Sequence, residues 1–345
     1  MGRTGARMTP TSAHGSVHGT VHGTVLAIDA GQTGMKVRLQ QGATRDDMLF
    51  DGIRTHEPLL PQLAAVVHAT IKRSGARPEV LTAGISGLTD RDADAGTLLR
   101  LLHGTGIRDA ALAHDSTTSF LGALGNTRGA VVAAGTGVVT LAVGRDAIAR
   151  VDGWGYIMGD AGSGYWIGRE ALDAVMRAFD GRGPSTRLTE AVGARWPDLA
   201  QAYIALQGDD DRVQIVASFA QHVSRLADDD DAVSIEITER AATQLALSVT
   251  TSLDRVAPQG DDELAVCTLG GVFRSASLRR AFASALARDG ADRTITVVPA
   301  RGDGIDGALA LADLAPQHPL SAAVHRATAW DPMPAGGAAR HATAL

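Results

Sequence analysis

Cysteine and aromatic residues are scarce in this chain of 345 residues. The one cysteine, Cys267, rules out a disulfide framework and a multi-cysteine metal or iron–sulfur site within one chain. We interpret Cys267, which lies in an apolar run, as a small buried residue. Aromatic residues make up 4% of the chain, whereas the 40 glycines indicate many tight turns and close backbone approaches.

Long apolar runs and an excess of positive charge are also missing. No run approaches the roughly 18 apolar residues of a membrane-spanning helix, and the first 23 residues lack the apolar segment of a secretory signal. We therefore expect no membrane partner and a cytoplasmic location. The formal net charge is −6 without a large basic patch, so we expect no nucleic-acid partner.

The composition that remains, 45% hydrophobic and 20% charged, is that of an ordinary globular protein, and the length favours two domains. We expect a disordered N-terminus at 1–23 and a loose C-terminal tail at 316–345. One domain is expected to comprise 24–120 plus 305–315. The other is expected to span 121–304 and to carry helical insertions.

The pattern between the two ends is α/β, with a β-hairpin leading each half. The expected strands are Val25–Asp29, Met35–Leu39, Val80–Ile85, Ala110–His114, Gly129–Ala134, Val138–Gly144, Leu264–Leu269 and Ile295–Val298. The expected helices cover 59–73, 94–104, 116–124, 168–180, 187–194, 198–206, 211–227, 232–257, 277–288 and 305–314.

Two glycine-containing turns echo each other, each between an apolar strand and a further strand. In the first turn, Gly31, Gln32 and Thr33 offer backbone and side-chain donors to phosphate oxygens, and Lys36 adds a positive charge. Asp29 precedes it and could hold the water shell of Mg²⁺. An ordinary hairpin would also explain this turn.

The second turn is Gly135, Thr136 and Gly137. Facing the first across a cleft, it could grip a polyphosphate from the other side. Gly270, Gly271 and Ser275 follow a later strand and would let a flat base lie against bare backbone.

Asp115 follows a short strand and opens a helix, so it is either a helix cap or a general base. As a base it would accept the proton of a sugar hydroxyl during phosphoryl transfer. Ser86 and Gly87, in the loop after another strand, are further candidate substrate ligands.

The stretch 153–170 is dense in glycine and aromatic residues, a composition that suits ligand contact. Within it, Gly153 and Asp160 are candidate substrate ligands. Asp160 could accept hydrogen bonds from vicinal sugar hydroxyls or face an ammonium group.

Taken together, these motifs resemble the N-acetylglucosamine kinases and the BadF/BadG/BcrA/BcrD ATPase family of the actin/hexokinase/Hsp70 superfamily. The stretch Trp154–Gly168 is similar to the GWG…GDEGSxYWIG segment of the amino-sugar kinases, and 24–315 is covered in all. The resemblance implies two ribonuclease H-like (actin-like ATPase) domains with an interdomain cleft, and ATP as phosphoryl donor. It also implies Mg²⁺ held largely through water by Asp29 and Asp115, and a homodimer.

One residue and one segment depart from the family pattern. Ala161 stands where relatives carry Glu, and 51–54 lacks the sugar-binding Asn of animal N-acetylglucosamine kinases. We therefore expect a glucosamine kinase that forms glucosamine 6-phosphate, with N-acetylglucosamine as the alternative substrate. A non-catalytic sugar sensor and an ATPase that remodels a partner protein are alternatives on the same fold.

Overall fold

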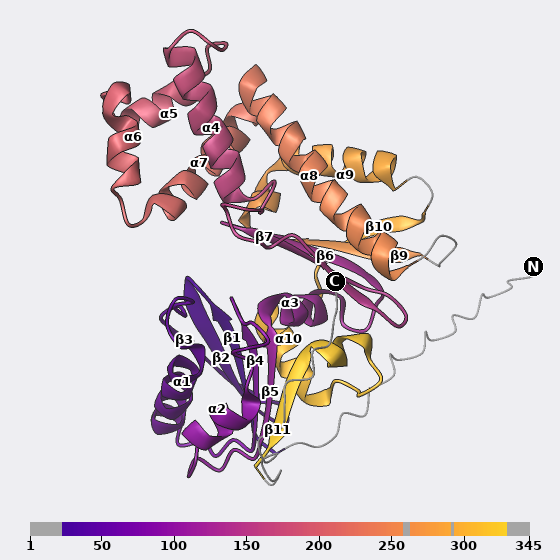
Figure 1. The fold of residues 1–345 in the computed structure, drawn as a ribbon. Coiled ribbons are helices and arrows are strands. Elements are labelled where there is room, and N and C mark those ends of the chain that lie inside the picture. Colours follow the sequence, from indigo (N-terminus) through magenta and orange to yellow (C-terminus); the bar gives the residue numbers. More distant parts are fainter. Residues whose placement is uncertain (1–22, 258–262, 291–292, 330–345) are drawn as a thin grey trace, which may run out of the picture.

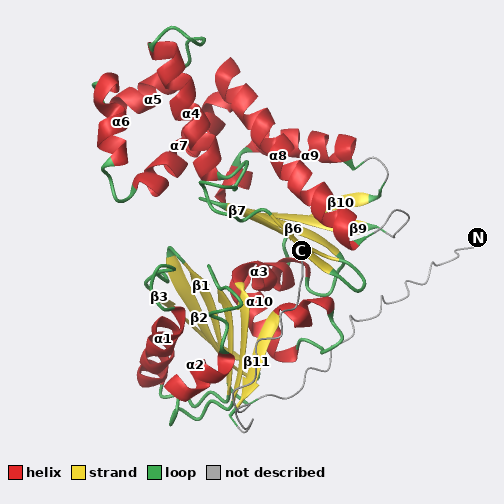
Figure 2. Cartoon of the chain, viewed as in Figure 1, coloured by secondary structure: helices red, strands yellow, loops and turns green. Residues whose placement is uncertain are grey.

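The computed structural model describes residues 23–257, 263–290 and 293–329, which form two β-sheets with their own helices (Figure 1). The α/β class expected from the sequence is confirmed. Between β8 and β9 of the second sheet, the described residues form helices and loops but no strand (Figure 2). Within the described ranges, no helix is both long and apolar enough to cross a membrane.

The first sheet has six strands in the order β11-β5-β4-β1-β2-β3. Strands β1 to β3 form an antiparallel meander, and β4 and β5 run parallel to β1. All residues of β4 are buried, as expected for a central strand covered on both faces. The bounds are β1 Val25–Gly31, β2 Gly34–Gln41, β3 Thr44–Phe50, β4 Val80–Ile85, β5 Asp109–His114 and β11 Val324–Thr328.

Two pairs of helices cover this sheet. On one face, α1 (Leu59–Ser74) and α2 (Ala95–Leu101) bury Leu63, Val67 and Leu98 against the strands. On the other face lie α3 (Asp115–Leu124) and α10 (Gly304–Ala310).

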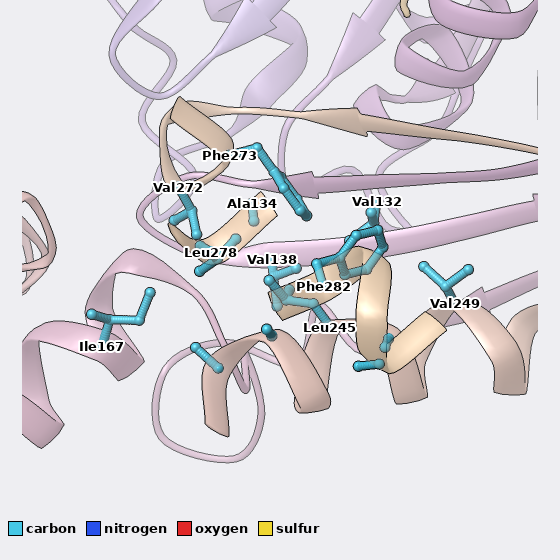
Figure 3. Close-up of a cluster of buried hydrophobic side chains, with 14 of the residues drawn as sticks. Val132, Ala134, Val138, Ile167, Leu245, Val249, Val272, Phe273, Leu278 and Phe282 are labelled. Carbon is cyan, nitrogen blue, oxygen red and sulfur yellow. The ribbon is translucent and has the colours of Figure 1, made fainter. Parts of the chain in front are cut away.

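The second sheet has the order β10-β9-β6-β7-β8. One face packs against α8 and α9 through Val132, Val249 and Phe282 (Figure 3). Cys267 lies in β9 and is fully buried, as expected. The bounds are β6 Gly129–Ala134, β7 Val138–Val143, β8 Ile148–Val151, β9 Leu264–Leu269, β10 Ile295–Val298, α4 Gly164–Phe179, α5 Leu188–Arg195, α6 Leu199–Gln207, α7 Arg212–Asp228, α8 Ala232–Val256 and α9 Ala276–Asp289.

Helix α3 lies between the two sheets and joins them. Its Phe120 and Leu124 share one apolar cluster with Leu141 of the second sheet. Helices α3 and α10 approach backbone to backbone, because a methyl group added at Gly307 would lie 1.7 Å from the Thr118 carbonyl oxygen. This close packing fixes the start of α3, where Asp115 lies.

Three strands differ from expectation, and all three are edge strands. Strands β3 and β8 were not expected, because β3 carries three charged residues in a row and β8 is only four residues long. The expectation of a loose tail is wrong at residues 324–328, because β11 pairs antiparallel with β5 over five residues. Expected disorder at 1–23 lies outside the described residues except for residue 23.

Candidate active site

Asp115 is the first residue of α3 and follows β5 directly. The Ser86 hydroxyl, just after β4, donates to Asp115 Oδ2 over 2.5 Å. The other carboxylate oxygen, Oδ1, is buried beside the His114 ring. The N-cap of α3 is His114, whose side chain accepts the Ser116 N–H, so Asp115 is not the cap residue. The carboxylate is thus held by Ser86 through Oδ2, while Oδ1 faces the His114 ring.

The surroundings of Asp115 keep it ionised. Burial alone would raise its pKa, but nearby His114, the Ser86 hydroxyl and the Ser116 N–H together hold the pKa below its ordinary value. His114 Nδ1 lies 2.8 Å from Oδ1. Asp115 is therefore a carboxylate at neutral pH, as a general base must be.

Asp29 lies near the end of β1, opposite Lys36 of β2 in the antiparallel ladder. Burial raises the pKa of Asp29 to about 6; Lys36 opposes the rise, and the charges of Asp115 and Asp303 add to it. Lys36 Nζ lies 2.7 Å from Asp303 Oδ2, just before α10. Two carboxylates, Asp29 and Asp303, and the Lys36 ammonium group thus lie beside the first turn at one end of the first sheet.

The tip of the first turn is exposed at Gln32 and Thr33. The neighbouring segment packs closely on it, since the Ile53 N–H donates to the Gly31 carbonyl over 3.0 Å. A methyl group added at Gly52 would lie 1.9 Å from the Gln32 carbonyl oxygen. The segment 51–54 is therefore part of the wall beside this turn.

The second turn joins β6 to β7, and the start of α4 is docked on it. The Gly164 N–H donates to the Gly135 carbonyl over 2.8 Å, and the Tyr165 N–H to the Thr136 carbonyl over 3.0 Å. A methyl group added at Gly137 would lie 2.5 Å from Asp160 Oδ2. The loop that contains Asp160, the second turn and the start of α4 are therefore packed together.

A cavity of about 750 Å³ opens beside the second turn. It brings together four of the expected nucleotide residues, Gly135, Thr136, Gly271 and Ser275. Gly270 is not among its lining residues; it has a φ of +96°, and an added methyl group would lie 2.2 Å from the Ala134 carbonyl oxygen. Side chains that were not expected also line the cavity: Gln214, Gln221, Arg225 and Arg274.

The loop after β8 is organised by Asp152, which was not expected to matter. Its carboxylate accepts the N–H groups of Gly153 (2.8 Å), Asp160 (2.8 Å) and Ala161 (3.0 Å). Its one sequence signal is the Asp-Gly pair that it forms with Gly153, which marks a turn. Side chains along the loop point outward, with Ile157 81% exposed.

Asp160 lies inside this loop and is only 7% exposed. Its Oδ1 accepts the Gly155 N–H over 3.2 Å. Burial and the nearby charge of Asp152 raise its pKa. The structure therefore places Asp160 behind the second turn, where its carboxylate is hydrogen-bonded to the backbone of Gly155 in the loop and of Val138 at the start of β7. Gly87 is exposed and has a φ of +73°.

The carboxylates fit a magnesium ion that is held mostly by water. Asp29 and Asp115 are near enough for the charge of one to raise the pKa of the other. Mg²⁺ takes one or two carboxylates and keeps several waters. Within the described residues there is no cluster of three or more His, Cys, Asp or Glu that could hold a metal by itself.

Comparison with known proteins adds three findings. The profile of the BadF/BadG/BcrA/BcrD ATPase family matches residues 107–312. The N-acetylmuramic acid/N-acetylglucosamine kinase of Clostridium acetobutylicum is 29% identical over 173 residues, which are 47% of this chain and 54% of that protein. The N-acetyl-D-glucosamine kinase of Dictyostelium discoideum is 42% identical over 72 residues, 21% of this chain and 23% of that protein. The alignments thus span about half of one curated relative and a quarter of the other.

Solved structures share the fold. A Chromobacterium violaceum protein assigned as an N-acetylglucosamine kinase superimposes with a TM-score of 0.66 and 24% identity, over 85% of this chain and all of that one. At this identity the likeness concerns the fold, and it agrees with the two-sheet architecture expected from the sequence.

Proposed function

The chain belongs to the BadF/BadG/BcrA/BcrD ATPase family, and from this premise we propose that it is an ATP-dependent kinase of an N-acetylated amino sugar. The observation that carries the proposal is the Asp115 carboxylate at the start of α3, with Oδ2 fixed by Ser86 and Oδ1 buried beside His114. A carboxylate oxygen has two acceptor sites, so Oδ1 can accept a further donor from a ligand beside His114. A sugar hydroxyl is such a donor.

In the proposed reaction, Asp115 Oδ1 accepts the proton of the sugar hydroxyl. The hydroxyl oxygen forms a bond to the γ-phosphorus of ATP, and the bond from that phosphorus to the β–γ bridging oxygen breaks to release ADP. Positioning and charge supply most of the catalysis in such transfers. We place the reacting hydroxyl at O6, which is unhindered in a hexosamine.

The nucleotide is proposed to lie in the cavity beside the second turn, with its phosphates between the two turns. Gly271 and Gly135 leave open space there, since no described atom lies within 4 Å of a methyl group added at either. Lys36 would leave Asp303 for the phosphates. When bound, Mg²⁺ neutralises charge on the transferring phosphates. Asp29 and Asp115 would anchor its water shell.

The acceptor is inferred from the relatives and from Asp160. Both curated relatives are named as kinases of N-acetylated sugars. Free glucosamine carries an ammonium group that needs an open carboxylate, whereas Asp160 is buried and already accepts a backbone N–H. Glucosamine stays the second candidate, because the loop holds two carboxylates, Asp152 and Asp160, and 51–54 has no Asn.

The test is the ratio of kcat/KM for N-acetylglucosamine and glucosamine at neutral pH, within a panel that includes glucose, mannosamine and N-acetylmannosamine. We expect N-acetylglucosamine to have the higher value. A higher value for glucosamine would reverse the choice of acceptor and keep the kinase assignment. ADP release at the same rate without any sugar would favour a partner-remodelling ATPase. Sugar binding without turnover would favour a sensor.

A further inference from the structure

Helix α7 presents a stripe of polar side chains to the nucleotide cavity. The members of the stripe recur every three or four residues, so they lie on one side of the helix. They are Gln214, Ser218, Gln221, Arg225 and Asp228. The other side of α7 is apolar and packs into the core of the second half. The stripe is therefore the polar wall of the cavity.

This stripe runs from the phosphate end of the cavity toward the base end. The Thr136 hydroxyl, in the second turn, donates to Gln214 Oε1 over 3.3 Å, so the start of α7 lies beside the proposed phosphates. At a rise of about 1.5 Å per residue, Arg225 lies roughly 16 Å further along the helix axis. Helical side chains lean back toward the N-terminus, so the Arg225 side chain reaches toward the turn that carries Gln221. The base of an extended nucleotide would lie at these two side chains.

The segment after β9 forms another wall of the cavity, and it offers the base mainly backbone. Gly271 opens the 3-10 helix η1 (Gly271–Arg274), and no described atom lies within 4 Å of a methyl group added to it. Ser275 follows, but its hydroxyl already accepts the Leu278 N–H over 3.2 Å as the cap of α9. Among the described residues, no aromatic side chain lines the cavity. A flat base on Gly271 thus has no aromatic ring to cover its other face.

Arg225 is suited to cover that face. Its side chain is exposed in the cavity, and its Nη2 lies 3.4 Å from His222 Nδ1. No carboxylate of the described residues pairs with it, since Asp228 of the same stripe lies 3.8 Å from Arg280 instead. A guanidinium is planar, permanently charged and weakly hydrated, and it stacks on aromatic faces. Arg225 therefore supplies the flat surface that the lining otherwise lacks.

We infer that the nucleobase lies between the Gly271 backbone and the Arg225 guanidinium, and that the phosphoryl donors are purine nucleoside triphosphates in general. The inference rests on the proposed function, which places the nucleotide in this cavity. Arg274, the other arginine in the lining, follows Gly271 in the same 3-10 helix and so belongs to the same wall. Stacking gains with the area of the base, so two-ring purines bind better than pyrimidines.

The edge of the base meets Gln221, which suits either purine. Its amide offers both donors and an acceptor. A Gln amide pairs with N6 and N7 of adenine, and in the reversed orientation it pairs with O6 and N1–H of guanine. Rejection of one purine would need a polar group fixed in one orientation. Among the described residues, no hydrogen bond fixes the Gln221 amide, so ATP and GTP are both accepted.

The first experiment separates the base from the phosphates. Calorimetry on the full chain with Mg²⁺ measures the Kd for ADP and for inorganic tripolyphosphate, which has no base. We expect Arg225→Gln to raise the Kd for ADP by about tenfold, within the range for a cation stacked on a ring, and to leave the Kd for tripolyphosphate unchanged. Arg225→Lys keeps the charge without the plane, and its Kd for ADP should stay several-fold above that of wild type.

Arg212→Gln is the matched control, because Arg212 is an exposed arginine of the same helix outside the cavity lining. It should bind both ligands as wild type does. Equal weakening of ADP and tripolyphosphate in Arg225→Gln would assign the guanidinium to the phosphates and overturn the inference. Full recovery of ADP binding in Arg225→Lys would show that charge alone matters and would overturn it too.

The second experiment measures kcat/KM for ATP, GTP, CTP and UTP with N-acetylglucosamine as acceptor. We expect GTP within about fivefold of ATP, and both pyrimidine nucleotides lower by about tenfold or more. The gap between purines and pyrimidines should narrow in Arg225→Gln. A value for GTP as low as those for the pyrimidines would overturn the purine class.

Binding and turnover fail separately. ADP binding by wild type with an unchanged Kd in Arg225→Gln would overturn the stacked base and leave the kinase proposal standing. Loss of ADP affinity in Arg225→Gln, in a protein that phosphorylates no sugar, would support the stacked base and contradict the kinase proposal.

Discussion

Replacing Asp29 with Asn should make the protein more stable and less active. The pKa of the Asp29 carboxyl is raised from 3.8 to about 6, chiefly by burial. The native state therefore holds this proton more tightly than the unfolded chain does. Ionisation of Asp29 therefore destabilises the fold, and replacement by Asn removes this destabilisation. The same replacement removes the carboxylate that is proposed to anchor the water shell of Mg²⁺.

The magnitude follows from the two pKa values. Each pKa unit corresponds to about 1.4 kcal/mol, so a rise from 3.8 to about 6 amounts to about 3 kcal/mol. This destabilisation is absent below pH 3.8, grows between pH 3.8 and about 6, and is complete above that pH. At pH 7.5 we expect Asp29→Asn to raise the free energy of unfolding by about 2–3 kcal/mol.

The assay is urea unfolding without nucleotide or metal at pH 7.5 and pH 4.5, with turnover of Mg²⁺–ATP measured in parallel. The stability gain should shrink at the lower pH, and turnover should fall at neutral pH. Asp146→Asn, at an exposed carboxylate in the β7–β8 turn, is the matched control and should change neither quantity. An Asp29→Asn variant that is less stable than wild type at pH 7.5 would show that the buried Asp29 carboxylate does not destabilise the fold.

Four further substitutions test other parts of the site. Asp115→Asn should lower kcat by about 10²–10⁴ with little change in the Kd for ATP, and a variant that keeps half of wild-type turnover would contradict its role as general base. Gly271→Trp should abolish ATP binding, measured by calorimetry, with little loss of stability, since its side chain enters open space. Gly270→Ala should lower Tm, because its added methyl group would meet the Ala134 carbonyl oxygen at 2.2 Å. Equal losses of stability in the two variants would contradict this distinction. Asp152→Ala should raise KM for the sugar and increase proteolysis of the loop after β8, because three backbone N–H groups lose their acceptor, and unchanged values of both would show that the loop holds its shape without it.

Local patterns were sufficient for most of the fold. The apolar runs of β4 and β6 predict their bounds to the residue, and the hairpins around the two glycine turns follow from strand–turn–strand patterns. The edge strands β3, β8 and β11 could not be found this way. An edge strand is paired on one side only, so its residues can be polar, and its existence depends on a partner far away in the chain.

The sequence was sufficient to predict the site residues that stand at strand ends. It was not sufficient for residues whose position depends on how loops and helices pack. Asp115, Ser86 and Asp29 stand at strand ends, and parallel strands bring such ends together. The burial of Asp160 depends on how the loop folds over the second turn, which no local pattern records. Arg225 lies on the polar side of a helix whose periodicity indicates only a solvent-exposed face.

The kinase proposal is decided by ADP formation with and without N-acetylglucosamine, with the sugar product identified by phosphorus NMR. We expect ADP to form only when sugar is present and one sugar phosphate, bearing its phosphate at O6, to appear for each ADP. ADP release that is independent of sugar, or release without any phosphorylated sugar, would contradict it.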